Sequence, residues 1–231
     1  MFLCQAVKYI KGNWRGFGLN KQYCIFDMDG TLVDSMGVWK NLGRTYLERL
    51  GVSPTQEQLD ATGPMTMEES AAYFKQQFNL TLSTQQMIQH MNHYMETRYC
   101  TDIPLKKGAL DYILRLKKQG VSLCVATATE ETLAAACLER LGIMEQLDFL
   151  LSCETVGAGK TKPDIYYEAA KRLGASPCEI AVFEDAPYAI HTARKAGFYV
   201  VGVYEPVYAH HWSELQKLCH ECITTFSSGI D

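Results

Sequence analysis

The sequence lacks long apolar runs, internal repeats, low-complexity tracts and any excess of positive charge. No apolar segment approaches the roughly 20 residues of a transmembrane helix, so a membrane span is not expected. Lys and Arg number 22 against 26 Asp and Glu, which gives a net charge of −4. Nucleic acids and anionic membranes bind basic surfaces, so the charge balance predicts neither as a partner.

The start of the chain also lacks the pattern of a secretory signal. Gln5 and Lys8 interrupt its apolar residues, and no pair of small residues marks a cleavage site. Nine cysteines, an odd number scattered along the chain, fit a reducing compartment better than a disulfide framework. These features predict a cytoplasmic protein. Residues 1–20 show no clean periodicity and are expected to be an N-terminal extension, either a flexible leader or a covering strand.

Alternating strands and helices fill the second part of the chain. A length of 231 residues with 47% hydrophobic content is enough to bury a substantial core. Strands that are apolar on both faces and alternate with helices are typical of a parallel sheet covered on two sides, the doubly wound α/β class. The predicted strands are 23–27, 122–127, 149–152, 180–184 and 199–203. The predicted helices between them are 108–119, 130–141, 163–173 and 187–196, and a polar tail with one helix is expected after residue 206.

Residues 36–101 show helical patterns and no strand. Helix start signals occur at Ser53-Pro54-Thr55-Gln56, at Thr66-x-x-Glu69 and at Ser83-x-x-Gln86. Met87, Met91 and Met95 recur at helical spacing and are read as the core of a bundle, because Met fills irregular cores well. The sequence therefore predicts about four helices forming a cap domain (36–101) inserted into an α/β core (21–35 and 102–231).

Two carboxylates stand one residue apart at the end of the first predicted strand. The run 23–26 is apolar and is followed by Asp27, Met28, Asp29 and Gly30. The glycine ends the strand, which leaves Asp27 at its tip and Asp29 on a turn. Ligands of open α/β sheets bind beyond the carboxyl ends of the strands, where two acids can act as nucleophile and general acid/base. For this motif alone, an Asp-rich structural turn is an equal alternative.

Other strand ends carry complementary groups. Thr127-Ala128-Thr129 precedes a helix, where a hydroxyl and backbone N–H groups can hold phosphate. Lys160 and Lys162 follow the third strand, and Glu184-Asp185 end the fourth. Four acids on one rim repel each other unless a divalent cation joins them, and their hard oxygen ligands suit Mg²⁺. Acids, a hydroxyl, a lysine and a metal together indicate phosphoryl transfer through an aspartyl-phosphate.

These motifs resemble those of the haloacid dehalogenase (HAD) superfamily. The resemblance rests on Asp27-Met28-Asp29-Gly30-Thr31, on Thr127, on Gly159-Lys160-Thr161-Lys162-Pro163-Asp164 and on Phe183-Glu184-Asp185-Ala186, in this order. It covers residues 23–204, and the helical insert after the first motif is similar to that of the phosphatase and β-phosphoglucomutase-like branch.

The resemblance implies a role for each reacting group. Asp27 would be the nucleophile that takes the phosphoryl group. Asp29 would protonate the leaving alcohol and then activate water. Thr127 and the backbone at Ala128 would hold phosphate oxygens, and Lys160 would neutralise charge on Asp27 and the phosphoryl group.

The resemblance also implies a metal site. Mg²⁺ would be held by Asp27, by the backbone carbonyl of Asp29 and by Asp185, with Glu184 in support. Thr31 would help to orient Asp29. The expected activity is a Mg²⁺-dependent phosphatase acting on a small phosphorylated metabolite, as a monomer or small homo-oligomer.

Some positions depart from the family pattern and leave alternatives. Thr161 replaces the usual proline, so Lys162 competes with Lys160, which fits the pattern better. A sugar-phosphate mutase would share these motifs, but the mutases carry a histidine on the first cap helix where this chain has Trp39. A dehalogenase would lack an acid at the position of Asp29, and a non-enzymatic binding protein would be expected to have lost a motif residue.

Other candidates carry less weight. The cap loop Thr62-Gly63-Pro64-Met65 is a candidate substrate contact. His90 and His93 are expected on the bundle surface, although a substrate contact remains an alternative. The pairs His210-His211 and Cys219-x-x-Cys222 fit no common zinc module, and a solvated tail helix is expected there.

Overall fold

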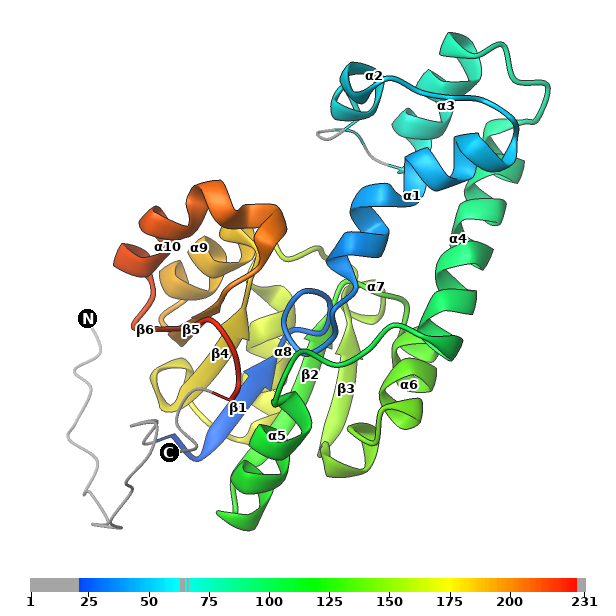
Figure 1. The fold of residues 1–231 in the computed structure, drawn as a ribbon. Coiled ribbons are helices and arrows are strands. Elements are labelled where there is room, and N and C mark those ends of the chain that lie inside the picture. Colours follow the sequence, from blue (N-terminus) through cyan, green and yellow to red (C-terminus); the bar gives the residue numbers. More distant parts are fainter. Residues whose placement is uncertain (1–20, 63–64, 66, 228–231) are drawn as a thin grey trace.

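The computed structural model describes residues 21–62, 65 and 67–227, so the expected N-terminal extension lies outside the described residues. The described chain forms a six-stranded parallel sheet in the order β3-β2-β1-β4-β5-β6, with helices on both faces (Figure 1). The strands are Tyr23–Phe26 (β1), Ser122–Thr127 (β2), Phe149–Ser152 (β3), Ile180–Glu184 (β4), Tyr199–Val203 (β5) and Glu221–Ile223 (β6). The predicted doubly wound α/β class is confirmed.

Helices alternate with the strands as the sequence predicts, with ends that differ by one residue at most. The core helices are Ala109–Lys118 (α5), Glu131–Arg140 (α6), Asp164–Leu173 (α8), Pro187–Lys195 (α9) and Trp212–Leu218 (α10), with short turns at Cys153–Val156 (α7), Met144–Gln146 (η1), Pro177–Glu179 (η2) and Pro206–His211 (η3). Among the described helices, none has both the length and the apolar character that crossing a bilayer demands.

Side chains that alternate along the strands build two separate apolar layers. One face packs against α8, α9 and α10, with Ile25 of β1 at its centre. The other face packs against α5 and α6, with Phe26 of β1 stacked on Phe183 of β4 at 4.3 Å between ring centroids. Tyr112 of α5 meets Phe183 edge-on. Both layers are buried, so the sheet holds the tips of β1, β2 and β4 in fixed positions.

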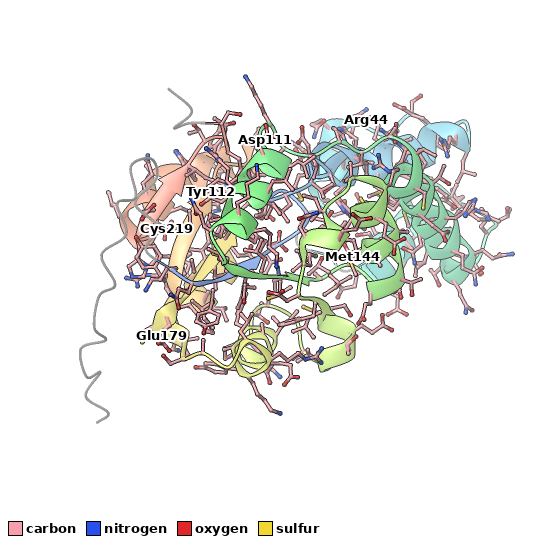
Figure 2. The ribbon with its side chains drawn as sticks, turned by 90° about the horizontal axis from the view of Figure 1, so that it is seen from below. Arg44, Asp111, Tyr112, Met144, Glu179 and Cys219 are labelled. Carbon is pink, nitrogen blue, oxygen red and sulfur yellow. The ribbon has the colours of Figure 1, made fainter. Side chains whose placement is uncertain are left out.

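Four helices lie between β1 and α5 and project from the carboxyl end of the sheet (Figure 1). They are Met36–Arg49 (α1), Gln56–Asp60 (α2), Met67–Gln77 (α3) and Thr84–Thr101 (α4), and we call them the helical insert. The methionine stripe of α4 is buried inside the insert, as the sequence predicts. Figure 2 views the molecule from below, with Arg44 of α1 on one side and Cys219, between α10 and β6, on the other.

Helix starts in the insert follow the sequence signals in part. Ser83 and Gln86 form the predicted capping box of α4. The start expected at Ser53 is wrong, because Thr55 caps α2 and its box partner is Gln58. Pro54 therefore precedes the helix rather than opening it. Thr66 lies outside the described residues.

The tail after residue 206 contains more structure than the sequence predicts. The expected solvated helix over Cys219–Cys222 is wrong: α10 ends at Leu218, and β6 begins at Glu221 as a parallel edge strand beside β5. A strand of three residues is too short to show a period in the sequence. β6 forms because it pairs with β5 in the folded sheet.

The aromatic stack on β1 should dominate the stability of the core. Phe26→Ala removes a fully buried ring from Phe183, and we expect a loss of about 3–5 kcal/mol in the free energy of unfolding. Urea denaturation followed by circular dichroism measures it. Leu50→Ala, at a side chain that is 39% exposed, is the control and should change stability far less. Equal losses in the two variants would contradict this account of the core.

Candidate active site

The chain turns sharply after β1, and this turn brings two neighbouring strands together. Asp27 stands at the tip of β1, where its N–H donates to the carbonyl of Phe183 at 2.9 Å. Gly30 has a φ of +82°, and a Cβ at this position would lie 2.2 Å from Asp185 Oδ2. Any other residue would therefore push the turn away from the end of β4.

Three carboxylates converge at this point, as the sequence predicts. Asp27, Glu184 and Asp185 each offer an oxygen, and these oxygens lie within 4.8 Å of one another. All three side chains are buried. Burial raises the pKa of Asp27 to about 7, with Glu184 and Asp29 adding to the shift and Lys160 opposing it. Burial, with the charges of Asp27 and Glu184, also raises the pKa of Asp185 well above its usual range.

Lys160 is the cation of this cluster. Its buried ammonium contacts Asp27 Oδ1 and donates to Glu184 Oε1 at 2.6 Å. Burial alone would lower the pKa of Lys160, but the two carboxylates outweigh it and raise the pKa. Lys162, the competing lysine of the sequence, is exposed. Tyr166 of α8 donates to the same Glu184 oxygen at 2.8 Å, a contact that sequence analysis missed.

The acidic cluster has the donor set of a hard divalent cation. Asp185 Oδ2 is buried and has no hydrogen-bond partner. A single ammonium faces three carboxylates, so negative charge is in excess when all are ionised. Carboxylate oxygens are the ligands that Mg²⁺ and Ca²⁺ prefer. Asp27, Glu184 and Asp185 could therefore hold such an ion, and the orphaned oxygen of Asp185 fits a ligand position.

Asp29 turns its carboxylate away from the cluster and towards the helical insert. Ser35 donates to Asp29 Oδ1 at 2.6 Å, and Thr129 donates to Asp29 Oδ2 at 2.6 Å. Ser35 precedes α1 but makes no side-chain cap, because its hydroxyl serves Asp29 instead. The expectation that Thr31 orients Asp29 is wrong, since its hydroxyl donates to Asp185 Oδ1 at 3.3 Å.

A third hydroxyl reaches Asp29 from the far end of α4. Tyr99 is fully buried and donates to Asp29 Oδ1, and it accepts a hydrogen bond from Trp39 Nε1 of α1 at 2.8 Å. Tyr99 was missed by sequence analysis, although it continues the stripe of Met91 and Met95 by one helical turn. The stripe indicated burial, but no local signal shows that this hydroxyl meets a residue 70 positions earlier.

At the end of β2, some of the groups expected to bind phosphate already have other hydrogen-bond partners. Thr127 is buried beside the tip of β1, and its hydroxyl accepts from the N–H of Thr129 at 3.0 Å. The expectation of free N–H groups at the start of α6 is wrong for two of them. Glu130 caps this helix and accepts from the N–H groups of Thr132 and Leu133.

A cavity of about 930 Å³ lies between these strand ends and the insert. Asp29, Ala128 and Thr129 line its core side, and Met65 of the predicted cap loop lines its insert side. Thr62 bonds its own backbone at Leu59, and Gly63 and Pro64 lie outside the described residues. The two bundle histidines are not among the lining residues described.

Those histidines border a separate cavity of about 250 Å³ between α1 and α4. His90 packs against Tyr46, and His93 is largely exposed and lies 3.2 Å from Glu96. Their predicted place on the bundle agrees with these contacts.

Several known proteins are similar to this chain in sequence. A validoxylamine A 7'-phosphate phosphatase of Streptomyces hygroscopicus subsp. limoneus is 28% identical over 179 residues, which cover 78% of this chain and 84% of that protein. A beta-phosphoglucomutase of Bacillus subtilis is 25% identical over 190 residues, covering 78% and 81%.

Solved structures share the fold. A HAD hydrolase of family IA, variant 3, from Entamoeba histolytica superposes with a TM-score of 0.73 at 23% identity, covering 89% of this chain and 93% of that one. The family model of haloacid dehalogenase-like hydrolases matches residues 24–203, which include all of the motif residues above. This chain belongs to the haloacid dehalogenase-like hydrolase family.

Proposed function

We propose that this chain is a Mg²⁺-dependent phosphatase that hydrolyses a small phosphorylated metabolite through an aspartyl-phosphate on Asp27. One observation carries the proposal. The Asp27 carboxylate stands at the tip of β1 with Lys160 on one oxygen and two further carboxylates within 4.8 Å. A nucleophile, a cation and a set of metal ligands thus meet at one point. Relatives named as phosphatases support the reaction class.

The proposed chemistry divides between two aspartates. The Asp27 carboxylate attacks phosphorus, and the bond to the leaving oxygen breaks as Asp29 gives that oxygen a proton. Asp29 then takes a proton from water as the water oxygen attacks phosphorus. The bond between phosphorus and the Asp27 oxygen breaks, which releases phosphate and regenerates the Asp27 carboxylate. Hydroxyls of Ser35, Tyr99 and Thr129 surround the Asp29 carboxylate and fix its direction.

The other residues would stabilise the negative charge of the phosphoryl group. Lys160 offsets the charge of Asp27 and of the phosphoryl oxygens, and Thr127 with the backbone of Ala128 would bind those oxygens. Asp27, the Asp29 carbonyl and Asp185 would hold Mg²⁺, with Glu184 in support. The ion would supply further positive charge at the phosphoryl group.

The helical insert is proposed to act as a cap, comprising residues 36–101 on a core of 21–35 and 102–231. The cavity is lined from both parts, by Trp39 and Met95 of the insert and by Ala128 of the core. Closure of such a lid would exclude water until the phosphoenzyme has formed and would add substrate contacts.

Water, rather than a second substrate hydroxyl, is the proposed phosphoryl acceptor. Trp39 lines the cavity and donates its indole N–H to Tyr99. An indole nitrogen cannot accept a proton or pair with a carboxylate, so it cannot gate Asp29 as an imidazole can. A sugar-phosphate mutase remains the alternative that shares these motifs.

Removing the metal should stop turnover, because only Lys160 would then offset the buried carboxylates that face the substrate phosphate. Exhaustive chelation is expected to abolish phosphate release, and added Mg²⁺ should restore it. Asp185→Ala should weaken Mg²⁺ binding by more than the roughly 10–100-fold typical of an outer-shell change. Calorimetry measures the affinity, and circular dichroism checks the fold. Full activity after chelation would refute the metal requirement.

Substituting the two aspartates should impair turnover in different ways. Asp27→Asn should show no turnover above background, because no covalent intermediate can form. Asp29→Asn should slow turnover by about 10²–10⁴-fold and accumulate phosphoenzyme, because water loses its base. Acid-quenched labelling followed by peptide mapping locates the phosphate. Phosphate found on a residue other than Asp27 would refute the assignment of Asp27 as the nucleophile.

The fate of the phosphoryl group separates phosphatase from mutase. With a hexose 1-phosphate, free phosphate should form much faster than hexose 6-phosphate, because nothing at the position of Trp39 gates Asp29 against water. Both products can be followed in one reaction by phosphorus NMR. Faster formation of the 6-phosphate would establish the mutase instead.

A further inference from the structure

We propose that the end of the substrate remote from its phosphate carries no negative charge, and that a protonated amine there is preferred over a neutral hydroxyl. The inference rests on the proposed phosphatase function and names the substrate class of the same cavity. The evidence for this inference is the charge of the residues that line the cavity.

Carboxylates are the charged groups of this wall. Glu96 and Glu130 line the cavity in addition to Asp29, which belongs to the reacting end. Among the residues that the structure describes, no Lys, Arg or His lines it. The three positions beside Met65 that lie outside the described residues are a glycine, a proline and a threonine, none of which carries charge. A second phosphate or a carboxylate would therefore enter without a counter-charge, at a cost in desolvation and repulsion.

Two cations of the core, Lys160 and Arg140, have partners outside this wall. Lys160 is held between Asp27 and Glu184 at the phosphoryl end. Arg140 lies behind Tyr99 and spends its guanidinium on the backbone carbonyls of Tyr99 and Ile103. Neither of them is among the residues that line the cavity.

Two of these carboxylates have hydrogen-bond or ionic partners that the structure shows. Glu130 accepts from the N–H groups of Thr132 and Leu133, and these bonds lower its pKa. Glu96 is 59% exposed on α4. Its Oε2 lies 3.2 Å from the imidazole of His93, and the residue also lines the cavity.

Aromatic side chains complete the wall. Trp39, Tyr188 and Tyr208 line the cavity together with the amide of Asn92. Aromatic faces attract ammonium groups and pack against the apolar faces of carbon rings, and amides bond hydroxyls. Carboxylates with aromatic rings and no cation match an amine-bearing, hydroxylated monophosphate. The described residues of this wall include no cation to offset the second phosphate of a bisphosphate, which is a further obstacle to mutase chemistry.

A charge series on one carbon skeleton tests the inference. Glucosamine 6-phosphate, glucose 6-phosphate and 6-phosphogluconate carry a positive, a neutral and a negative group away from the phosphate. With Mg²⁺ present, kcat/KM should fall in that order, by about tenfold or more at each step, equivalent to ~1.4 kcal/mol per step. Calorimetric affinities for the inactive Asp27→Asn protein should follow the same order.

A matched pair of variants assigns the preference to the cavity. Glu96→Gln should reduce the preference for the amine and improve binding of 6-phosphogluconate. Glu145→Gln is the control, since it removes the same charge from an exposed residue of η1, whose neighbour Met144 is marked in Figure 2. It should leave the ranking unchanged. An equal effect of both variants would overturn the role of the cavity wall.

The proposed function and this inference can fail separately. Failure of the wild type to release phosphate from p-nitrophenyl phosphate with Mg²⁺ would refute the phosphatase, while the affinities for Asp27→Asn still report the ranking. The inference would be overturned if 6-phosphogluconate bound as well as glucose 6-phosphate, or if glucosamine 6-phosphate bound no better than glucose 6-phosphate. It would also be overturned if none of the three bound.

Discussion

The burial of negative charge at the ends of β1 and β4 is the constraint on which the site depends. Asp27, Glu184 and Asp185 lie within a few ångströms of one another, away from water, and Lys160 offsets part of their charge. Such a cluster is costly without further cations, and a divalent ion and a reacting phosphoryl group suit it because they interact with the same oxygens. The close turn at Gly30 is needed to bring the two strand ends together.

A second set of contacts joins this cluster to the helical insert. Asp29 accepts from Tyr99, which in turn accepts from Trp39, so one carboxylate is tied to both long helices of the insert. Arg140 supports this arrangement from α6 through the carbonyl of Tyr99. The position of the insert and the direction of the Asp29 carboxylate are therefore coupled. The cavity beside Asp29 is lined by Glu96, Glu130 and aromatic side chains.

The sequence by itself determined most elements of the core and the polar residues that meet at the strand ends. Strands with apolar residues on both faces and glycines after the helices are local signals, so the ends of β2 to β5 were predicted to the residue. The acids were found because parallel strands bring their carboxyl ends to one edge, which places Asp27 beside Glu184 and Asp185 whatever the loops do. Lys160 was favoured over Lys162 by pattern, and its burial agrees.

Only the tertiary structure decided which partner each polar side chain takes. The hydroxyl of Thr31 reaches Asp185 rather than Asp29, and Glu130 takes helix N–H groups that the sequence left for phosphate. Tyr99 meets Asp29 across 70 positions, and β6 exists because β5 offers it an edge. Periodicity reports whether a side chain is buried, because burial depends on the face of its own element. Hydrogen-bond partners depend on how distant elements pack, and a local sequence pattern does not contain that information.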